Sequence, residues 1–207
     1  MNKNIHYPED KLILKKLASY TGVAAAAMLL LPANSHAEIK YYDPDDILIS
    51  NDNRAYDIDI NKDNITDFQI ALNTSSYIST TFYTYYYSSM NMRNILNGNL
   101  VVANNDFISK LSENMYIGPT AQWDNAAVFC EGTGSYFDST TRGNWTEDAY
   151  KKFIGIKFKI SGEDHYGWIR ASVYSKMYNM VVTIHDWAYE DKPGVPIKAG
   201  QTGSSSY

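Results

Sequence analysis

The stretch FIGIKFKISGEDHYGWIR, residues 153–170, decides the fold class. Its first half alternates between apolar side chains on one side and small or basic ones on the other, namely Ile154, Ile156, Phe158 and Ile160 against Gly155, Lys157 and Lys159. A period of two is typical of a β-strand that buries one face. The residues Ser161 to Asp164 supply a turn, and His165 to Tyr174 follows as a partner strand. The stretch therefore predicts a β-hairpin.

The rest of the chain favours the same class. Met180 to Tyr189 predicts a third strand, and its apolar residues on both faces are typical of a central strand. Short alternating runs separated by Gly, Asn, Asp and Ser clusters recur elsewhere, for example at Ile39 to Tyr42 and Ile47 to Ser50 around the acidic turn 43–46. Phe107 to Met115 is the best candidate for a short helix. We expect an all-β sandwich with few short helices.

The stretch DINKDNITD, Asp59 to Asp67, places oxygen-bearing side chains at alternate positions of a polar loop. Loop positions one, three, five and nine are Asp59, Asn61, Asp63 and Asp67. Position seven is Ile65, which offers its backbone carbonyl. Oxygen ligands at this spacing are what Ca²⁺ prefers. The loop therefore predicts one Ca²⁺ site.

The loop differs from an EF-hand loop at two positions. Position twelve is Ile70 instead of a bidentate Glu, and position six is Asn64, which tolerates the positive φ that a Gly usually supplies there. Tyr56 to Ile60 and Phe68 to Leu72 alternate like strands, so the motif resembles the strand-flanked DxDxDGxxD loops of integrin-type propellers and thrombospondin repeats. The alternative is an acidic hairpin turn without metal, because Asp and Asn also cap turns through the backbone.

The first 37 residues have the pattern of a signal peptide. A basic region is followed by the apolar run Val23 to Leu31 and by the small-x-small sequence Ser35 to Ala37. The run is too short to span a bilayer, and no later stretch replaces it. Removal of residues 1–37 takes away four lysines and two acids and leaves 14 Lys and Arg against 21 Asp and Glu, a formal charge of −7. We expect a secreted or periplasmic protein that does not bind nucleic acid.

Candidate catalytic residues are few. Cys130 is the only cysteine, so no intramolecular disulfide can form, and its apolar neighbours favour a buried packing role. Two histidines remain after cleavage. His165 directly follows Asp164, and His185 directly precedes Asp186. In such a pair the histidine can act as a general base while the aspartate orients its ring. No nucleophile is marked beside them, which favours structural histidines. Carboxylate pairs leave no spacing signature, and none of the later glutamates Glu131, Glu147, Glu163 and Glu190 stands out.

A tyrosine-rich span indicates a binding surface. Tyr83, Tyr85 and Tyr87 fall on one face of any strand there, and Tyr86 falls on the other. Together with Trp123 and Trp145 these residues could form an exposed platform on which sugar rings stack. The alternative is that Tyr and Thr fill a half-exposed strand simply because they are strong β formers.

The chain also resembles a group of uncharacterised secreted bacterial β-sandwich proteins. The resemblance rests on HYGWIR at 165–170, on DWAYE at 186–190 and on the PGVPIKAG end at 193–200, together with the calcium-type loop near the N-terminus. It implies a jelly-roll or lectin-like sandwich, and it implies no activity. We expect one domain over 38–200, and the small and polar residues at the end predict a flexible tail at 201–207. The motif also has a purely structural reading, in which Gly167 admits a neighbouring aromatic and Arg170 pairs with Asp186 or Glu190.

The sequence leads to a functional hypothesis with two rivals. We expect a calcium-stabilised, non-catalytic binding or surface module, with a glycan or cell-envelope component as partner. A polysaccharide-acting hydrolase with an unidentified carboxylate pair, and a purely structural envelope or matrix protein, remain as alternatives.

Overall fold

The predicted hairpin lies at the centre of one of two sheets, here called sheet A. The computed structural model describes residues 37–78, 84–135, 139–146, 149–176 and 179–203. In sheet A, β12 (Ala149–Ile160) pairs antiparallel with β13 (Glu163–Lys176), which pairs with β14 (Asn179–Glu190). The hairpin loop is two residues long rather than the four expected, because Ile160 pairs with Glu163. Ser161 and Gly162 have φ of 53° and 88°, the left-handed values that a two-residue hairpin turn requires.

The outer edge of sheet A is one strand broken in the middle. Both β1 (Ile39–Tyr42) and β2 (Ile47–Ile49) pair antiparallel with β14. The acidic segment 43–46 therefore does not reverse the chain; it interrupts an edge strand and lies beside the middle of β14. On the opposite side β6 (Leu100–Asn104) pairs with β12 and with β9 (Trp123–Asp124).

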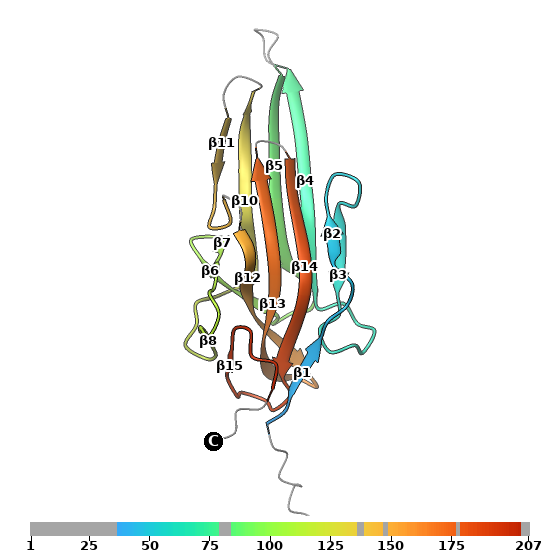
Figure 1. Ribbon diagram of the computed structural model, residues 1–207, viewed down its shortest axis with the longest axis vertical. Helices are drawn as coiled ribbons and strands as arrows, with labels where there is room; N and C mark the ends of the chain where they lie inside the picture. The colour runs from blue at the N-terminus through green and yellow to red at the C-terminus, as the bar shows by residue number, and fades with distance from the viewer. Residues whose placement is uncertain (1–36, 79–83, 136–138, 147–148, 177–178, 204–207) are drawn as a thin grey trace, which may run out of the picture. The chain divides into compact units, whose positions relative to one another are not determined.

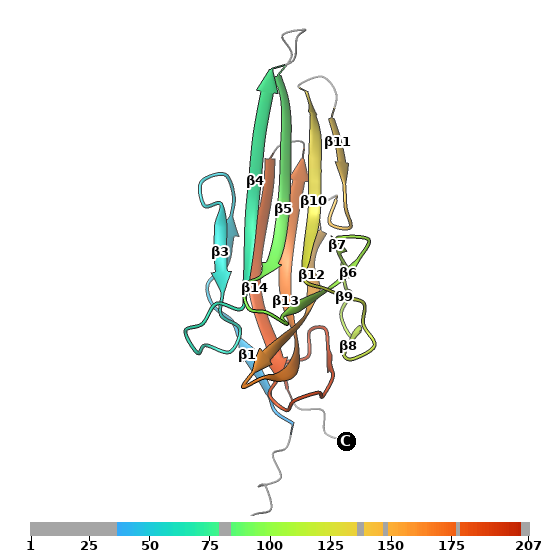
Figure 2. The same cartoon turned by 180° about the vertical axis from the view of Figure 1, so that it is seen from behind.

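Sheet B faces sheet A. Its strands, in spatial order, are β3 (Ala55–Ile58), β4 (Phe68–Ile78), β5 (Thr84–Asn94), β10 (Ala126–Ser135) and β11 (Ser139–Arg142). The short β7 (Phe107–Ile108) pairs with β6 and, in parallel, with β10, so it links the two sheets into one continuous order of strands. Figures 1 and 2 show β13 and β14 in front of β4 and β5 from one side and behind them from the other.

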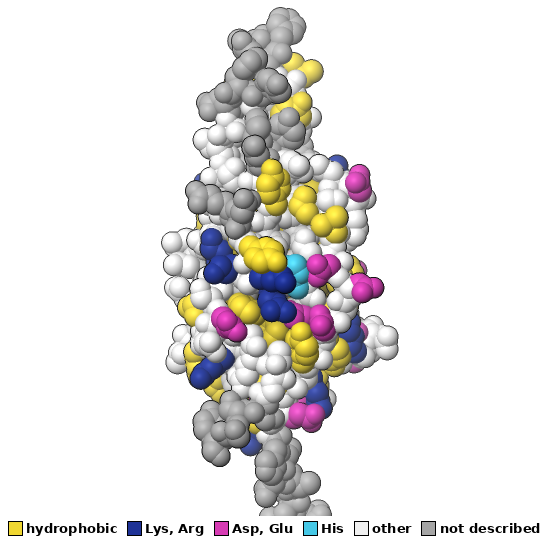
Figure 3. All heavy atoms as spheres, in the orientation of Figure 1, with side chains coloured by type: hydrophobic (Ala, Val, Ile, Leu, Met, Phe, Trp, Pro, Cys, Tyr) yellow, Lys and Arg dark blue, Asp and Glu magenta, His cyan; other side chains and the backbone are white. Residues whose placement is uncertain are grey.

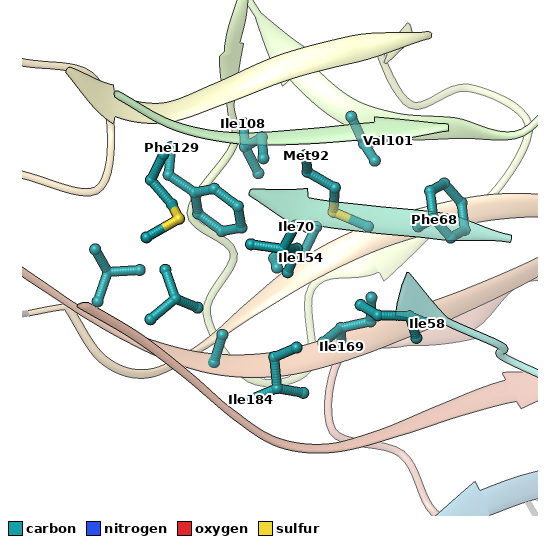
Figure 4. Close-up of a cluster of buried hydrophobic side chains, with 14 of the residues drawn as sticks. Ile58, Phe68, Ile70, Met92, Val101, Ile108, Phe129, Ile154, Ile169 and Ile184 are labelled. Atoms are coloured by element: carbon teal, nitrogen blue, oxygen red, sulfur yellow. The ribbon is translucent and has the colours of Figure 1, made fainter. Parts of the chain in front are cut away.

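The core lies between the sheets. Fully buried side chains of both sheets form one hydrophobic cluster, including Ile58, Ile70, Phe68 and Met92 from sheet B and Ile154, Ile169 and Ile184 from sheet A (Figure 4). Cys130 belongs to this cluster, as its apolar neighbours predicted, and burial raises the pKa of its thiol to about 11. The fold is all-β and sandwich-like, as the alternating runs predicted.

A second cluster covers the outer face of sheet A, and Ala188 is the residue of β14 that belongs to it. The alternation of β14 changes at the bulge at His185, which turns Trp187 and Tyr189 to the same core face as Val182 and Ile184, so the expectation of apolar residues on both faces is wrong. A small sheet of β8 (Tyr116–Ile117) and β15 (Ile197–Lys198) lies over this end. Trp168 is buried there, edge-on to Phe153 at 5.3 Å between ring centroids. A Cβ on Gly167 would lie 2.6 Å from the Ala188 carbonyl oxygen, so this position excludes a side chain. The Arg170 guanidinium pairs with Asp186, one of its two predicted partners.

The predicted helix at Phe107 to Met115 is wrong, and the described residues contain no helix. Asn105 and Asp106 have φ of 51° and 67° and form a tight turn, after which β7 pairs back onto β6. Leu111 then forms a bridge with Phe153 of β12, so strand pairing takes the hydrogen bonds that a helix would have used. In the part of the chain that the structure describes, no helix is long and apolar enough to cross a membrane.

The two ends of the predicted domain are only partly within the described residues. The predicted signal peptide lies outside them except for Ala37. Of the predicted tail 201–207, Gln201 accepts a hydrogen bond from the Trp168 indole at 3.0 Å, and residues 204–207 lie outside the described residues.

Sheet B continues beyond sheet A at one end. β4, β5, β10 and β11 run past the ends of β13 and β14 in both views (Figures 1 and 2). Buried side chains give way there to Ser, Thr, Tyr and Gly, and residues 75–78 of β4 are all exposed. A sheet with no opposite layer has no core to fill, which explains this change in composition.

Candidate binding site

The extension of sheet B carries a row of aromatic and hydroxyl side chains on its outer face. The register places Tyr85 opposite Tyr77 on β4 and opposite Ser135 on β10, and it places Tyr87 opposite Thr133. Met90 and Met92 of β5 point into the core, so the odd-numbered residues of the strand point outward. Tyr85 and Tyr87 therefore share the outer face.

These side chains line a hollow of about 430 Å³, which we call the tyrosine hollow. It is lined by Tyr77, Tyr85, Tyr86, Tyr87, Thr133, Gly134, Ser135, Ser139 and Thr140. The rings of Tyr77 and Tyr85 stack with centroids 5.3 Å apart and an interplanar angle of 12°. Tyr77 is 64% exposed, so this large aromatic surface is open to solvent.

A polar region adjoins the tyrosine hollow. The Tyr87 hydroxyl donates to Glu131 Oε2 at 3.1 Å, and Glu131 also forms an ion pair with Arg142. A second hollow of about 270 Å³ is shared between these three residues and the facing hydroxyls of Thr133 and Thr140. Aromatic faces beside hydroxyl, carboxylate and guanidinium groups can stack on and hydrogen-bond a polar ring.

The residues predicted for the platform do not all meet. Tyr85 and Tyr87 lie together on the outer face, Tyr86 belongs to the opposite face at the hollow's margin, and Tyr83 lies outside the described residues. Neither tryptophan takes part, so that expectation is wrong. Trp145 is fully buried against Phe129, and Trp123 stacks on Tyr166 in the second cluster.

Some of the residues that line the tyrosine hollow were not predicted from the sequence. Thr133, Ser135 and Thr140 come from strands β10 and β11, whose pairing with β5 is remote in sequence. The available signal was the alternation of residues 131–135, in which Glu, Thr and Ser alternate with two glycines.

The predicted calcium loop joins β3 to β4, as its alternating flanks predicted. Asp59 accepts hydrogen bonds from the backbone amides of Asp63 at 3.2 Å and Asn64 at 2.7 Å. Asn61 Oδ1 lies 3.4 Å from the same Asp63 amide, and Asn61 Nδ2 donates to Asp63 Oδ2 at 3.0 Å. Asp63 Oδ1 accepts from the Ile65 amide at 2.9 Å. Asp59, Asn61 and Asp63 thus converge on the loop's own backbone.

Asp67 lies apart from these three, at the buried base of the loop. It is 2% exposed, and its carboxylate accepts hydrogen bonds from the Ile60 amide at 2.8 Å and from Asn99 Nδ2 at 3.2 Å. Burial, with smaller contributions from the charges of Asp63 and Asp59, raises the pKa of Asp67 from 3.8 to about 6. Asn99 also accepts from the Lys159 amide at 3.0 Å, so one buried amide ties the loop to β12.

The loop fits a cation only in part. Asn64 has φ of 68°, the positive value expected at position six. The Lys62 ammonium lies 4.4 Å from the Trp187 ring centroid. In this position Lys62 does not form an ion pair with the loop carboxylates. Within the described ranges, no group of three or more His, Cys, Asp or Glu side chains is arranged to hold a metal ion. A Ca²⁺ ion here would depend on Asn61 and on backbone oxygen as well as carboxylates.

The predicted histidine and aspartate pairs do not form. His165 is buried, and its Nδ1 lies 2.9 Å from the Glu190 carbonyl oxygen, whereas Asp164 pairs with Lys159 at 2.6 Å. His185 contacts Asp46 rather than Asp186, which is bound to Arg170. Neighbours along a strand point to opposite faces or are displaced by bulges, so adjacency in sequence was a poor guide.

The two hollows on sheet B do not contain a pair of carboxylates. The tyrosine hollow is lined by no acid, and the adjoining hollow has Glu131 alone, which is bound to Arg142. Comparison of the chain with protein-family models, with curated proteins and with solved structures found no match.

Proposed function

We propose that this protein is an exported binding module whose tyrosine hollow takes a glycan without catalysing a reaction on it. The observation that carries the proposal is the stacked, solvent-exposed pair Tyr77 and Tyr85 beside the hydroxyls of Thr133, Ser135 and Thr140. A sugar ring has an apolar face that stacks on an aromatic ring and hydroxyls at its edge that hydrogen-bond, so this surface matches a sugar in both respects. The signal-peptide pattern of residues 1–37 supports export, where glycans and cell-envelope components are encountered.

A neutral or weakly cationic glycan is favoured over an acidic one. The chain after residue 37 has a formal charge of −7, which repels anionic polymers at long range. Within the site, Glu131 and Arg142 compensate each other and leave aromatic and hydroxyl groups as the main contacts.

The test is a glycan-array screen of residues 38–207, followed by calorimetric titration of the strongest ligand. Tyr77→Ala and Tyr87→Ala should each weaken binding about 5-fold or more, because loss of a stacking contact is worth roughly 1 kcal/mol or more. Tyr116→Ala is the matched control, since Tyr116 is 55% exposed but lies on β8. Absence of binding across the array, or equal loss in all three variants, would contradict the proposal.

We further propose that Ca²⁺ binds the β3–β4 loop through Asp59, Asn61 and Asp63, with the Ile65 carbonyl, and that the buried Asp67 carboxylate contributes its charge from the base of the loop. Support comes from the convergence of Asp59, Asn61 and Asp63 and from the mutual repulsion of three carboxylates, which a divalent cation would relieve. Bound Ca²⁺ would stiffen the loop through which Asn99 connects the two sheets. The melting temperature measured with and without Ca²⁺ tests this assignment.

A further inference from the structure

The outer face of sheet A brings together a serine, a histidine and an aspartate from three separate segments. Ser172 Oγ lies 2.8 Å from His185 Nε2, and His185 Nδ1 lies 2.8 Å from Asp46 Oδ1. In the tautomer whose Nδ1–H is donated to Asp46, the free Nε2 accepts the Ser172 hydroxyl proton. This is the order of contacts in which a histidine acts as a general base toward a serine and an aspartate orients the imidazole.

Two β-bulges create this arrangement at the same level of the sheet. Between β13 and β14 the pairing passes from Arg170↔Asp186 to Ala171↔Ile184, so His185 is an extra residue outside the ladder. Between β12 and β13 two residues, 150 and 151, stand opposite Ser172. Bulges re-aim side chains and are frequent next to active sites. The break between β1 and β2 then places Asp46 beside His185.

The second bulge also gives Ser172 a backbone donor. Lys151 has φ of 46°, and its amide donates to Ser172 Oγ at 3.0 Å instead of to a strand carbonyl. An amide this close to the serine oxygen can also reach the oxyanion, which is bonded to the same carbon as the serine oxygen in the tetrahedral intermediate. Ser172 therefore has a base on one side and an N–H donor on the other.

A hollow lies directly beside Ser172. Its volume is about 210 Å³, and Tyr150, Val173, Tyr174 and Val181 line it together with Ser172 itself. Tyr150 and Tyr174 are 70% and 43% exposed, so the hollow is open to solvent. Figure 3 shows this face, with hydrophobic side chains grouped beside basic and acidic ones. An apolar recess of this size suits a small acyl or aryl group rather than a polymer.

We propose that Ser172, His185 and Asp46 form a second site, on sheet A, that hydrolyses small carboxylic esters. Ser172 Oγ bonds to the ester carbonyl carbon while His185 takes the hydroxyl proton. The carbon–alkoxide bond then breaks, and the alcohol leaves with that proton. Water attacks the acyl-serine, gives a proton to His185, and releases the carboxylic acid as the proton returns to Ser172. Ser172 and His185 are the catalytic residues, and Asp46 is a positioning residue.

Covalent labelling tests the nucleophile directly. The mature chain is incubated with a phosphonyl fluoride, with which Ser172 Oγ would form a bond to phosphorus as fluoride leaves and His185 takes the proton. Intact-mass measurement and peptide mapping should find one phosphonyl group, on Ser172. Ser172→Ala should abolish labelling, and His185→Gln should slow it about 100-fold or more. No labelling of Ser172, or labelling spread over several serines, would overturn the proposal.

The role of Asp46 needs its own control, because a structural contact and a positioning contact look alike. Asp46 is 64% exposed, so Asp46→Asn should slow labelling while leaving the melting temperature unchanged. Asp46→Glu, which keeps the carboxylate, should recover most of the rate. Asp45→Asn removes the neighbouring exposed charge and should change neither quantity. Equal labelling rates in Asp46→Asn and the unmodified chain would remove Asp46 from the site.

Hydrolysis of p-nitrophenyl acetate provides an independent measure of turnover. The Ser172→Ala and His185→Gln variants should release nitrophenolate only at the background rate, measured in buffer with unfolded protein. The unmodified chain should release it faster than either variant. Circular dichroism of each variant separates loss of the nucleophile from loss of the fold. Equal hydrolysis by the folded Ser172→Ala variant would overturn the proposal, whatever the outcome of the glycan experiments on sheet B.

Discussion

Ionisation of Asp67 should make the protein less stable as the pH rises from 4 to 7. The pKa of this buried carboxyl is raised from 3.8 to about 6, so the folded state binds its proton more tightly than the unfolded state does. Stability then falls between the two pKa values and is constant above the higher one. At about 1.4 kcal/mol per pKa unit, two units correspond to about 3 kcal/mol.

The assay is urea unfolding of the chain and of Asp67→Asn at several pH values from 4 to 7.5 in the absence of Ca²⁺. The variant cannot titrate at this position, and any constant penalty from facing Asn99 with an amide does not depend on pH. The difference between the two free energies of unfolding should therefore change by about 2.4 kcal/mol over this range, in favour of the variant at higher pH, because a small part of the effect lies below pH 4. A difference that stays constant across this range would refute the reasoning.

Two other predictions concern the same loop. Ca²⁺ at about 100 times its Kd should stabilise the protein by about 2.7 kcal/mol and raise the melting temperature. Asp63→Ala should abolish this shift, whereas the control variant Asp164→Ala should keep it. Identical behaviour of the two variants would show that the ligands are misassigned. Asn99→Ala should lower the free energy of unfolding by about 2–3 kcal/mol in urea titration, because it leaves the Lys159 amide and the buried carboxylate short of partners. Asn97→Ala, at an exposed position of the same turn, should change it by less than about 0.5 kcal/mol.

The local features of the fold could be predicted from the sequence. The hairpin of residues 154–174, the third strand and the strand pair around the Asp59 loop follow from alternation and turn residues, which act over a few positions. Alternation also separated Tyr85 and Tyr87 from Tyr86 before any pairing was known. The helix expected at 107–115 failed because a tight turn at Asn105 and Asp106 returned the chain to β6.

The candidate sites depend on pairings that sequence does not contain. Ser172 and His185 are 13 positions apart and meet only because bulges displace both neighbouring strands. Asp46 is 139 positions from His185 and reaches it because β1 and β2 both pair with β14. Asn99 connects Asp67 to Lys159 through a register that local patterns leave undetermined. Each case requires strand order and register.

The most direct test of the proposed binding function is to map where a bound glycan contacts the chain. Hydrogen exchange of backbone amides, followed by mass spectrometry with and without the strongest array ligand, provides this map. We predict slower exchange in the ends of β4, β5, β10 and β11 that carry the tyrosine hollow, and unchanged exchange in β12 to β14. Protection confined to sheet A, or none at a saturating ligand concentration, would contradict the account.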